Sequence, residues 1–215
     1  MVEHYIHRGL INKNFRENTI KAFSQSFKRK YGIETDIHAT KDEKFICFHD
    51  FTLNKIFKKK KSIKDMKYSQ ISNISAQNKK PIPLLKDLLN ASKNKYPLFI
   101  EIKPTFSKKI LKKLLYETSK FSKCVFISFR HKNIYNLLKI RSSIKVGLSY
   151  SRSASVKTII KKSNNNKLNC LVLDKFFLQN KKVNGTKIRK YYYTIKTKSE
   201  FKKHRKNNNL IIENL

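Results

Sequence analysis

Charged side chains occupy alternate positions inside two short apolar runs of this sequence. Glu34 and Asp36 lie in G-I-E-T-D-I, and Glu101 and Lys103 lie in L-F-I-E-I-K. Such runs are typical of strands, in which residues two apart face the same way. Buried like charges need a cation to neutralise them, and carboxylate oxygens suit Mg²⁺ or Ca²⁺ better than Zn²⁺. Glu34, Asp36 and Glu101 are therefore candidate metal ligands.

Two histidines end separate predicted strands. His7 precedes Arg8 and Gly9 near the start of the chain, and His49 ends the run F-I-C-F-H. Two imidazoles can act as general base and general acid on opposite sides of one reacting atom. Arg8 and Lys103 are cations on the same elements. Together with a divalent metal, this set suits in-line cleavage of an anion, a phosphate ester. The spacing leaves open which histidine is the base and whether water or a substrate hydroxyl attacks.

The segments that must position these residues alternate between strand and helix about eight times. Strands are predicted at 3–8, 31–38, 45–49, 98–103, 123–128, 144–149, 168–173, 190–195 and 209–213, and helices at 18–30, from 81–83 onward, 107–120, 131–140, 154–162 and 198–206. This alternation indicates a parallel sheet with helical crossovers. The chain has four glycines and no glycine-rich phosphate loop, and ionisable residues end several different strands. We therefore expect one domain over residues 1–215, a compact TIM-type (β/α)8 barrel lacking a full last helix.

Three local features of this pattern are specific enough to test. Asn18 is predicted to cap the first helix, and Pro83 to lie in the first turn of a later one. Residues 51–80 are the least regular part, with the run 58–61 of four lysines as a solvated loop and one or two helical turns expected in S-I-K-D-M-K-Y-S-Q-I.

The order of the motifs resembles the glycerophosphodiester phosphodiesterase family. The matching pieces are H-R-G, E-N-T-x-x-A-F, G-x-E-x-D-x-x-x-T-K-D, H-D, I-P-x-L, E-I-K and S-F, strong over residues 7–50 and 81–103 and weak after 130. The resemblance implies a TIM-type barrel that hydrolyses glycerophosphodiesters to glycerol 3-phosphate and an alcohol, using a divalent metal. The roles that it implies are catalytic His7 and His49, metal ligands Glu34, Asp36 and Glu101, substrate contacts to phosphate by Arg8 and Lys103, and a pocket-lining Tyr193.

The sequence departs from the family pattern at four places. Glu43 follows Asp42 where a glycine is usual, Lys55 stands where an arginine is common, and Tyr193 replaces a tryptophan. The chain also ends I-I-E-N-L rather than I-T-D-x-P. Because none of these touches the two histidines or the three carboxylates, they bear on substrate choice more than on activity.

The composition is strongly basic, with 50 Lys and Arg against 14 Asp and Glu and a formal net charge of +36. The lysines are spread over nearly every segment, and the common Lys, Asn, Ile and Phe all have A/T-rich codons. We interpret the charge as a composition bias on solvated positions, with no specific nucleic-acid partner. The positive electrostatic field of the protein should still attract anionic substrates and allow weak contact with an acidic membrane surface at low salt.

Two alternatives to hydrolysis of small glycerophosphodiesters have distinct requirements. An exposed apolar rim around the mouth of the barrel would favour a lysophospholipase D acting on lipids, and the sequence does not show one. A basic polyanion-binding protein without catalysis would need a concentrated basic face, and would not need Glu34, Asp36 and Glu101 to converge. A catalytically inactive barrel is disfavoured, since every acid–base and metal position is filled.

The cysteines indicate a reducing compartment, and the remaining histidines indicate structural roles. Three cysteines lie inside apolar runs without a C-x-x-C pair, as buried free thiols do. No signal peptide or membrane-spanning run precedes the first motif, so a cytoplasmic location is expected. His4, His38, His131 and His204 are interpreted as structural. Asp50 is expected to orient the backbone or the adjacent loop.

Overall fold

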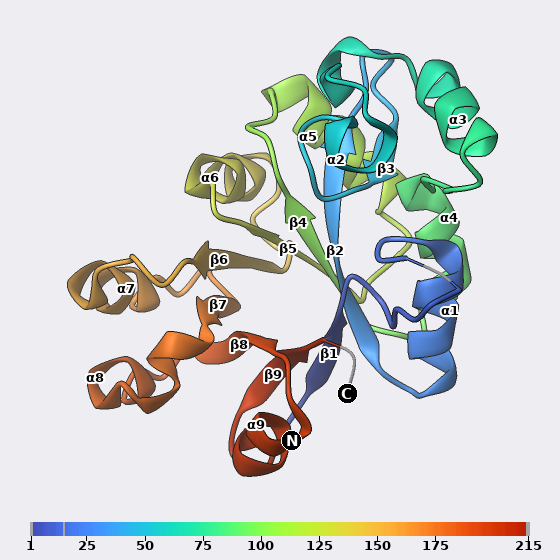
Figure 1. The fold of residues 1–215 in the computed structure, drawn as a ribbon. Helices are drawn as coiled ribbons and strands as arrows, with labels where there is room; N and C mark the ends of the chain where they lie inside the picture. Colours follow the sequence, from blue (N-terminus) through green and yellow to red (C-terminus); the bar gives the residue numbers. More distant parts are fainter. Residues whose placement is uncertain (1, 15, 214–215) are drawn as a thin grey trace.

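A closed barrel of parallel strands surrounded by helices forms this protein (Figure 1). The computed structural model describes residues 2–14 and 16–213. In these residues eight parallel strands follow the ring order β1-β2-β4-β5-β6-β7-β8-β9, and pairing of β9 with β1 closes the ring. The strands are β1 His4–His7, β2 Gly32–Ala39, β4 Leu98–Ile102, β5 Cys124–Ser128, β6 Val146–Tyr150, β7 Cys170–Asp174, β8 Arg189–Ile195 and β9 Asn209–Ile212. The expected TIM-type barrel is confirmed.

A ninth strand, β3 (Phe45–Cys47), pairs antiparallel with the end of β2 and lies outside the ring. The α-helices are α1 Ile20–Lys28, α2 Asn54–Phe57, α3 Tyr68–Gln77, α4 Leu85–Ser92, α5 Lys108–Glu117, α6 His131–Ile140, α7 Val156–Ser163, α8 Lys181–Asn184 and α9 Lys198–His204. Two 3₁₀ turns add η1 Ile63–Asp65 and η2 Lys175–Gln179. β9 ends at Ile212, one residue before the end of the described part of the chain.

Alternate strand residues divide the core into two layers, because successive side chains point to opposite faces. One layer packs the outer faces of the strands against the helices. The other fills the barrel interior with Tyr5, Phe99, Ile127, Cys170, Val172, Tyr191 and Ile211. A filled interior leaves the carboxyl-terminal mouth of the barrel as the place where polar groups can meet a ligand.

The first helix begins differently from the expectation. Its N-cap is Thr19, whose hydroxyl accepts a hydrogen bond from the Ala22 amide, so the prediction of Asn18 as the cap was wrong. Asn18 has a φ of 54° and is buried. Its side chain points inward and is used by the site described below.

The segment between β3 and β4 is more ordered than predicted. Residues 51–80 contain α2, η1 and α3, which pack over a second apolar cluster made of Ile46, Phe48, Leu53, Phe57, Ile63, Met66, Ile71 and Ile82. Pro83 lies before α4 rather than in its first turn. Its carbonyl accepts a hydrogen bond from the Cys47 amide, which keeps this stretch extended beside β3. None of the helices in the described part of the chain is long and apolar enough to cross a bilayer.

Candidate active site

The registers of three adjacent strands bring the predicted residues together at the mouth of the barrel. His7 on β1 is the partner of Glu34 on β2, and Asp36 on β2 is the partner of Glu101 on β4. Lys103 follows directly after β4. Side chains that are far apart in the sequence therefore share one small volume.

A tight turn after β1 directs the Arg8 side chain into the site. Arg8 has a φ of 55° and Gly9 a φ of 78°. A Cβ on Gly9 would lie 2.9 Å from the backbone carbon of Ala22, so the close approach of α1 requires a glycine here. The Arg8 amide donates to the Glu34 carbonyl at 2.8 Å. The guanidinium then lies with its Nε 3.0 Å from Oδ2 of Asp36.

Three buried carboxylates form the floor of the site. Glu34, Asp36 and Glu101 each offer an oxygen within 4.8 Å of the others. Lys103 Nζ lies 3.3 Å from Asp36 Oδ1 and 2.9 Å from Glu101 Oε1. Two cations, Arg8 and Lys103, thus face three carboxylates, and the cluster retains a net negative charge when all are ionised.

The three carboxyl groups differ in acidity because their neighbours differ. Burial and then repulsion from Asp36 and Glu101 raise the pKa of Glu34 well above its usual value. Burial and Asp36 likewise raise the pKa of Glu101 to about 7. Burial also opposes ionisation of Asp36, but Arg8 and Lys103 outweigh it and hold the Asp36 pKa below its ordinary value. Asp36 is therefore the carboxylate that the two cations stabilise.

The donor set fits a divalent metal such as Mg²⁺ or Ca²⁺. Oxygen ligands from several carboxylates are what these hard cations require. Glu34 Oε2 is buried and has no hydrogen-bond partner, which is costly for an ionised oxygen unless a cation compensates. A metal beside Glu34 would remove both the unpaired oxygen and the excess negative charge.

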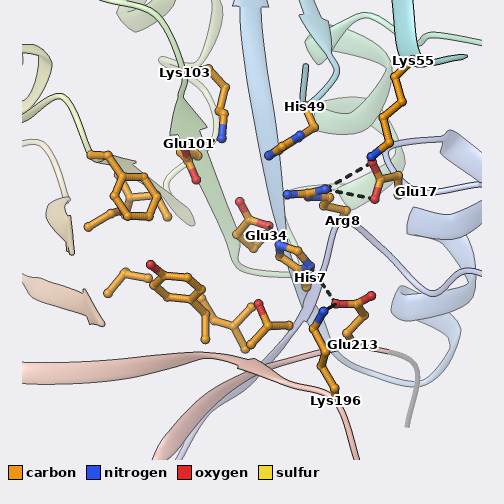
Figure 2. A pocket seen from close by; sticks show the side chains of 17 residues that line it. His7, Arg8, Glu17, Glu34, His49, Lys55, Glu101, Lys103, Lys196 and Glu213 are labelled. Carbon is orange, nitrogen blue, oxygen red and sulfur yellow. Dashed lines mark hydrogen bonds and ion pairs between the residues drawn. The ribbon is translucent and has the colours of Figure 1, made fainter. Parts of the chain in front are cut away.

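The two histidines lie on either side of the Arg8 side chain, beside the carboxylates (Figure 2). His49 Nδ1 lies 2.7 Å from Asp50 Oδ1. A carboxylate only accepts hydrogen bonds, so Nδ1 carries a proton and Nε2 is the nitrogen available to a ligand. His7 Nε2 lies 3.8 Å from Glu34 Oε2, and its Nδ1 lies 3.7 Å from Glu213 Oε2. The neighbouring His7 lowers the pKa of Glu213 to about 2.

Sequence reasoning missed three of these supporting contacts. Asp50 contacts the His49 ring rather than only backbone or loop. Glu213, in the final I-I-E-N-L, faces His7. Asn18 donates to Asp36 Oδ2 at 3.1 Å and accepts from the Thr35 hydroxyl at 2.7 Å. Asn18 and Asp50 lie inside the motifs E-N-T and H-D, and Glu213 lies in the final I-I-E-N-L, but a residue's place in a motif does not reveal where its side chain points.

Two further side chains, those of Glu17 and His38, border the site. Glu17 pairs with Arg8 Nη1 at 3.1 Å, at the outer side of the site. His38 is buried and contacts the His49 carbonyl through Nε2 at 3.2 Å, and burial lowers its pKa to about 4. It therefore borders the site as a neutral group that holds the backbone of His49.

A cavity of about 480 Å³ opens above the carboxylates. His7, Arg8, Glu34, His49, Glu101, Lys103 and Tyr193 all line it. The Tyr193 hydroxyl donates to the Tyr150 carbonyl at 3.0 Å, and its ring meets Phe129 edge to face. Asp36 lies beneath this surface, with its side chain 1% exposed. One wall of the cavity is aromatic and the opposite side is charged (Figure 2).

The fold and the site together define a TIM-barrel protein with a cluster of buried carboxylates, suited to a divalent metal, at the mouth of the barrel. The chain belongs to the glycerophosphoryl diester phosphodiesterase family, whose model matches residues 7–208.

Known relatives agree with this membership. A glycerophosphodiester phosphodiesterase of Caldanaerobacter subterraneus subsp. tengcongensis is 29% identical over 159 residues, which are 67% of this chain and 65% of that protein. The chain therefore matches slightly less than two thirds of that relative's length.

Solved structures share the fold over nearly their whole lengths. A glycerophosphodiester phosphodiesterase from Thermotoga maritima has a TM-score of 0.84 at 19% identity, covering 100% of this chain and 95% of that one. An Oleispira antarctica phosphodiesterase, solved in complex with the product sn-glycerol-3-phosphate, has a TM-score of 0.83 at 16% identity, covering 99% and 92%.

Proposed function

We propose that this chain hydrolyses glycerophosphodiesters to glycerol 3-phosphate and an alcohol, with the help of a divalent metal, Mg²⁺ or Ca²⁺. The observation that carries the proposal is that His7, His49, Glu34 and Glu101 line one cavity, with Asp36 beside the two glutamates beneath its surface. Family membership supports this reaction, and the Oleispira protein offers a relative whose structure holds glycerol 3-phosphate. We propose further that residues 1–215 act as a single domain, supported by the closure of the barrel between β1 and β9.

Each residue has a role in this proposal that follows from its position. Glu34, Asp36 and Glu101 would hold the metal, which supplies charge stabilisation for the phosphate and its transition state. Arg8 and Lys103 would bind the nonbridging phosphate oxygens, and Tyr193 would line the pocket for one of the substrate groups.

His7 and His49 are the acid–base pair of the proposal. One imidazole accepts a proton from the nucleophile, either water or the adjacent glycerol hydroxyl. The other donates a proton to the leaving alcohol oxygen. His49 already has Nδ1 protonated by its contact with Asp50, so its Nε2 is the atom that exchanges protons with the substrate.

The polyanion-binding alternative loses support from the same cluster. It did not require the three carboxylates to converge, and they lie within 4.8 Å of one another. A small-molecule substrate and no specific nucleic-acid partner remain the proposal. Its cytoplasmic setting is supported by Cys47, Cys124 and Cys170, which are free and buried.

The test is release of glycerol 3-phosphate from glycerophosphocholine and glycerophosphoethanolamine. It is measured with Mg²⁺, with Ca²⁺ and with EDTA, for the wild type and for His7→Ala, His49→Ala and Glu34→Ala. We expect loss of activity in EDTA and a fall of at least roughly 100-fold in each variant. His204→Ala, on α9 and outside the cavity, is the matched control and should retain full activity.

Two negative results have different meanings. Folded protein that binds metal but turns over neither substrate would show that the substrate class is wrong. Folded protein that neither binds metal nor turns over would contradict the enzymatic role as a whole. Phosphorus NMR during turnover separates the nucleophiles, because attack by the glycerol hydroxyl passes through a cyclic phosphate.

A further inference from the structure

Exposed aromatic side chains are concentrated at the mouth of the barrel. Among the described residues, the exposed large apolar side chains are Val2, Phe51, Tyr116, Phe129 and Phe176. The three phenylalanines, Phe51, Phe129 and Phe176, are 47%, 40% and 56% exposed. Phe129 and Phe176 follow the carboxyl-terminal ends of β5 and β7, and Phe51 contacts His38 near the carboxyl-terminal end of β2. Scattered single apolar residues are ordinary on a surface, but a group at one end of a molecule marks an interaction site.

Each of these phenylalanines is held in place by a neighbour. Phe51 meets the His38 ring edge to face with centroids 5.1 Å apart. Phe129 meets Tyr193 in the same way at 5.9 Å. The Arg152 guanidinium lies 5.0 Å from the centroid of the Phe176 ring. The rings are therefore presented outward from fixed positions around the cavity.

Exposed cations surround the same rings. Lys55 and Lys196 line the cavity, Arg130 follows Phe129 in the chain, and Arg152 covers Phe176. Three acidic side chains at this end pair with cations or histidines of the site: Glu17 with Arg8, Asp50 with His49, and Glu213 with His7 and Lys196. A fourth, Asp174 at the end of β7, accepts a hydrogen bond from the Phe176 amide. The outer surface of the mouth is thus aromatic and positively charged.

We propose that the mouth of the barrel docks on the surface of an anionic lipid bilayer, with Phe51, Phe129 and Phe176 inserting at the headgroup level. Aromatic residues beside Lys and Arg are the combination that binds such interfaces. A basic side chain near an anionic membrane contributes on the order of 1 kcal/mol. Docking in this orientation turns the cavity towards the lipid headgroups. The surface is independent of the proposed hydrolysis, so binding can be tested without measuring turnover.

Insertion can be measured directly, because the chain contains no tryptophan. Phe51→Trp and Phe176→Trp each place a single fluorophore at the mouth, and Tyr116→Trp places one on α5, where Tyr116 is 80% exposed. The probe is a vesicle of phosphatidylcholine and phosphatidylglycerol in equal parts, with phosphatidylcholine alone for comparison. On the anionic vesicles we expect a blue shift and quenching by brominated lipid for Phe51→Trp and Phe176→Trp, and neither change for Tyr116→Trp.

The orientation is tested by reversing charge at either end of the barrel. Arg130→Glu with Arg152→Glu changes the mouth. Lys123→Glu with Lys145→Glu makes the same change in net charge beside a hollow at the amino-terminal ends of the strands. We expect vesicle binding to weaken by at least about 30-fold for the mouth pair and by only a few-fold for the opposite pair.

Three outcomes would overturn the proposal. One is equal weakening by both pairs of substitutions, which would assign binding to net charge alone. Another is a tryptophan that stays unquenched in both Phe51→Trp and Phe176→Trp on vesicles that bind the protein. The third is failure of the folded wild type to bind anionic vesicles. If excess duplex DNA displaced Phe51→Trp and Phe176→Trp from vesicles on which neither tryptophan was quenched, the mouth would be a general polyanion surface.

Discussion

Asp50 holds the ring of its sequence neighbour His49, with Oδ1 2.7 Å from Nδ1. The contact fixes which nitrogen carries a proton and keeps Nε2 towards the cavity. A carboxylate in this position also stabilises the imidazolium that forms when Nε2 takes up a proton. The pair therefore has the geometry of a positioned acid–base group, although only His49 would touch the substrate.

Replacement of this carboxylate should affect turnover more than binding. We expect Asp50→Asn to lower kcat for glycerophosphocholine by about 10- to 100-fold with little change in KM. This loss is smaller than the full rate acceleration that a general acid or base usually provides, because His49 itself remains. Asp65→Asn, an exposed residue of η1, is the control and should leave both constants unchanged. The pH dependence of kcat should also change for Asp50→Asn, which a purely structural role would not produce. An unchanged kcat and pH profile would argue against positioning by Asp50.

The site residues that could be predicted from sequence lie on strands, because the position of a residue along a strand determines which way its side chain points. Glu34 and Asp36 project together because they are two apart on β2, and Glu101 joins them through the register of β2 with β4. A parallel barrel brings all such strand ends to one mouth. The fold and the metal cluster therefore follow from periodicity and motif order alone.

The residues that could not be predicted either lie in loops or depend on the closure of the barrel between β1 and β9, which are far apart in the sequence. Asn18 was expected to be a helix cap, since the sequence signal is the same for any polar residue before a helix. It instead has a positive φ and donates to Asp36, which leaves Thr19 to cap α1. Glu213 reaches His7 only because β9 pairs with β1 across the closure. Such contacts are set by tertiary structure, which local patterns do not encode.

Replacing Asp36 and replacing Glu34, the two carboxyl groups on β2, should affect the stability of the protein differently. Asp36 balances Arg8 and Lys103, so Asp36→Asn leaves buried cations underpaired and should destabilise the metal-free protein by about 3–5 kcal/mol. Glu34 instead has a raised pKa and an unpaired oxygen. Glu34→Gln should therefore leave the metal-free stability unchanged or raise it, while reducing the stabilisation that added metal provides.

Thermal unfolding in EDTA and in excess Mg²⁺ or Ca²⁺ measures both effects. The two substitutions are matched, since each replaces one buried carboxylate on the same strand by its amide. If Glu34→Gln destabilised the EDTA-treated protein as strongly as Asp36→Asn, the two carboxylates would have equivalent surroundings, contrary to the contacts with Arg8 and Lys103.

Metal affinity should depend on pH through Glu34 and Glu101. In the metal-free protein burial and Asp36 raise the pKa of Glu101 to about 7, and the pKa of Glu34 is raised as well. Protons therefore occupy these carboxyl groups at low pH and compete with the cation, because a ligating carboxylate must be deprotonated. Affinity should increase as pH rises through about 7 and fall about tenfold per pH unit below it for each proton displaced.

Titration calorimetry with Mg²⁺ or Ca²⁺ at several pH values, in buffers of different ionisation enthalpy, counts the released protons. We expect release of at least about one proton per metal near pH 6 and less at pH 8, with a corresponding loss of affinity at the lower pH. Glu101→Gln should bind more weakly and release fewer protons. Glu117→Gln on α5 also removes a carboxyl group of raised pKa, but it lies outside the cluster and should leave affinity and proton release unchanged. Equal affinity of the wild type at pH 6 and pH 8 would mean that Glu34 and Glu101 are already ionised without the metal. Arg8 and Lys103 would then offset only part of the negative charge of the cluster, and the metal would displace no proton on binding.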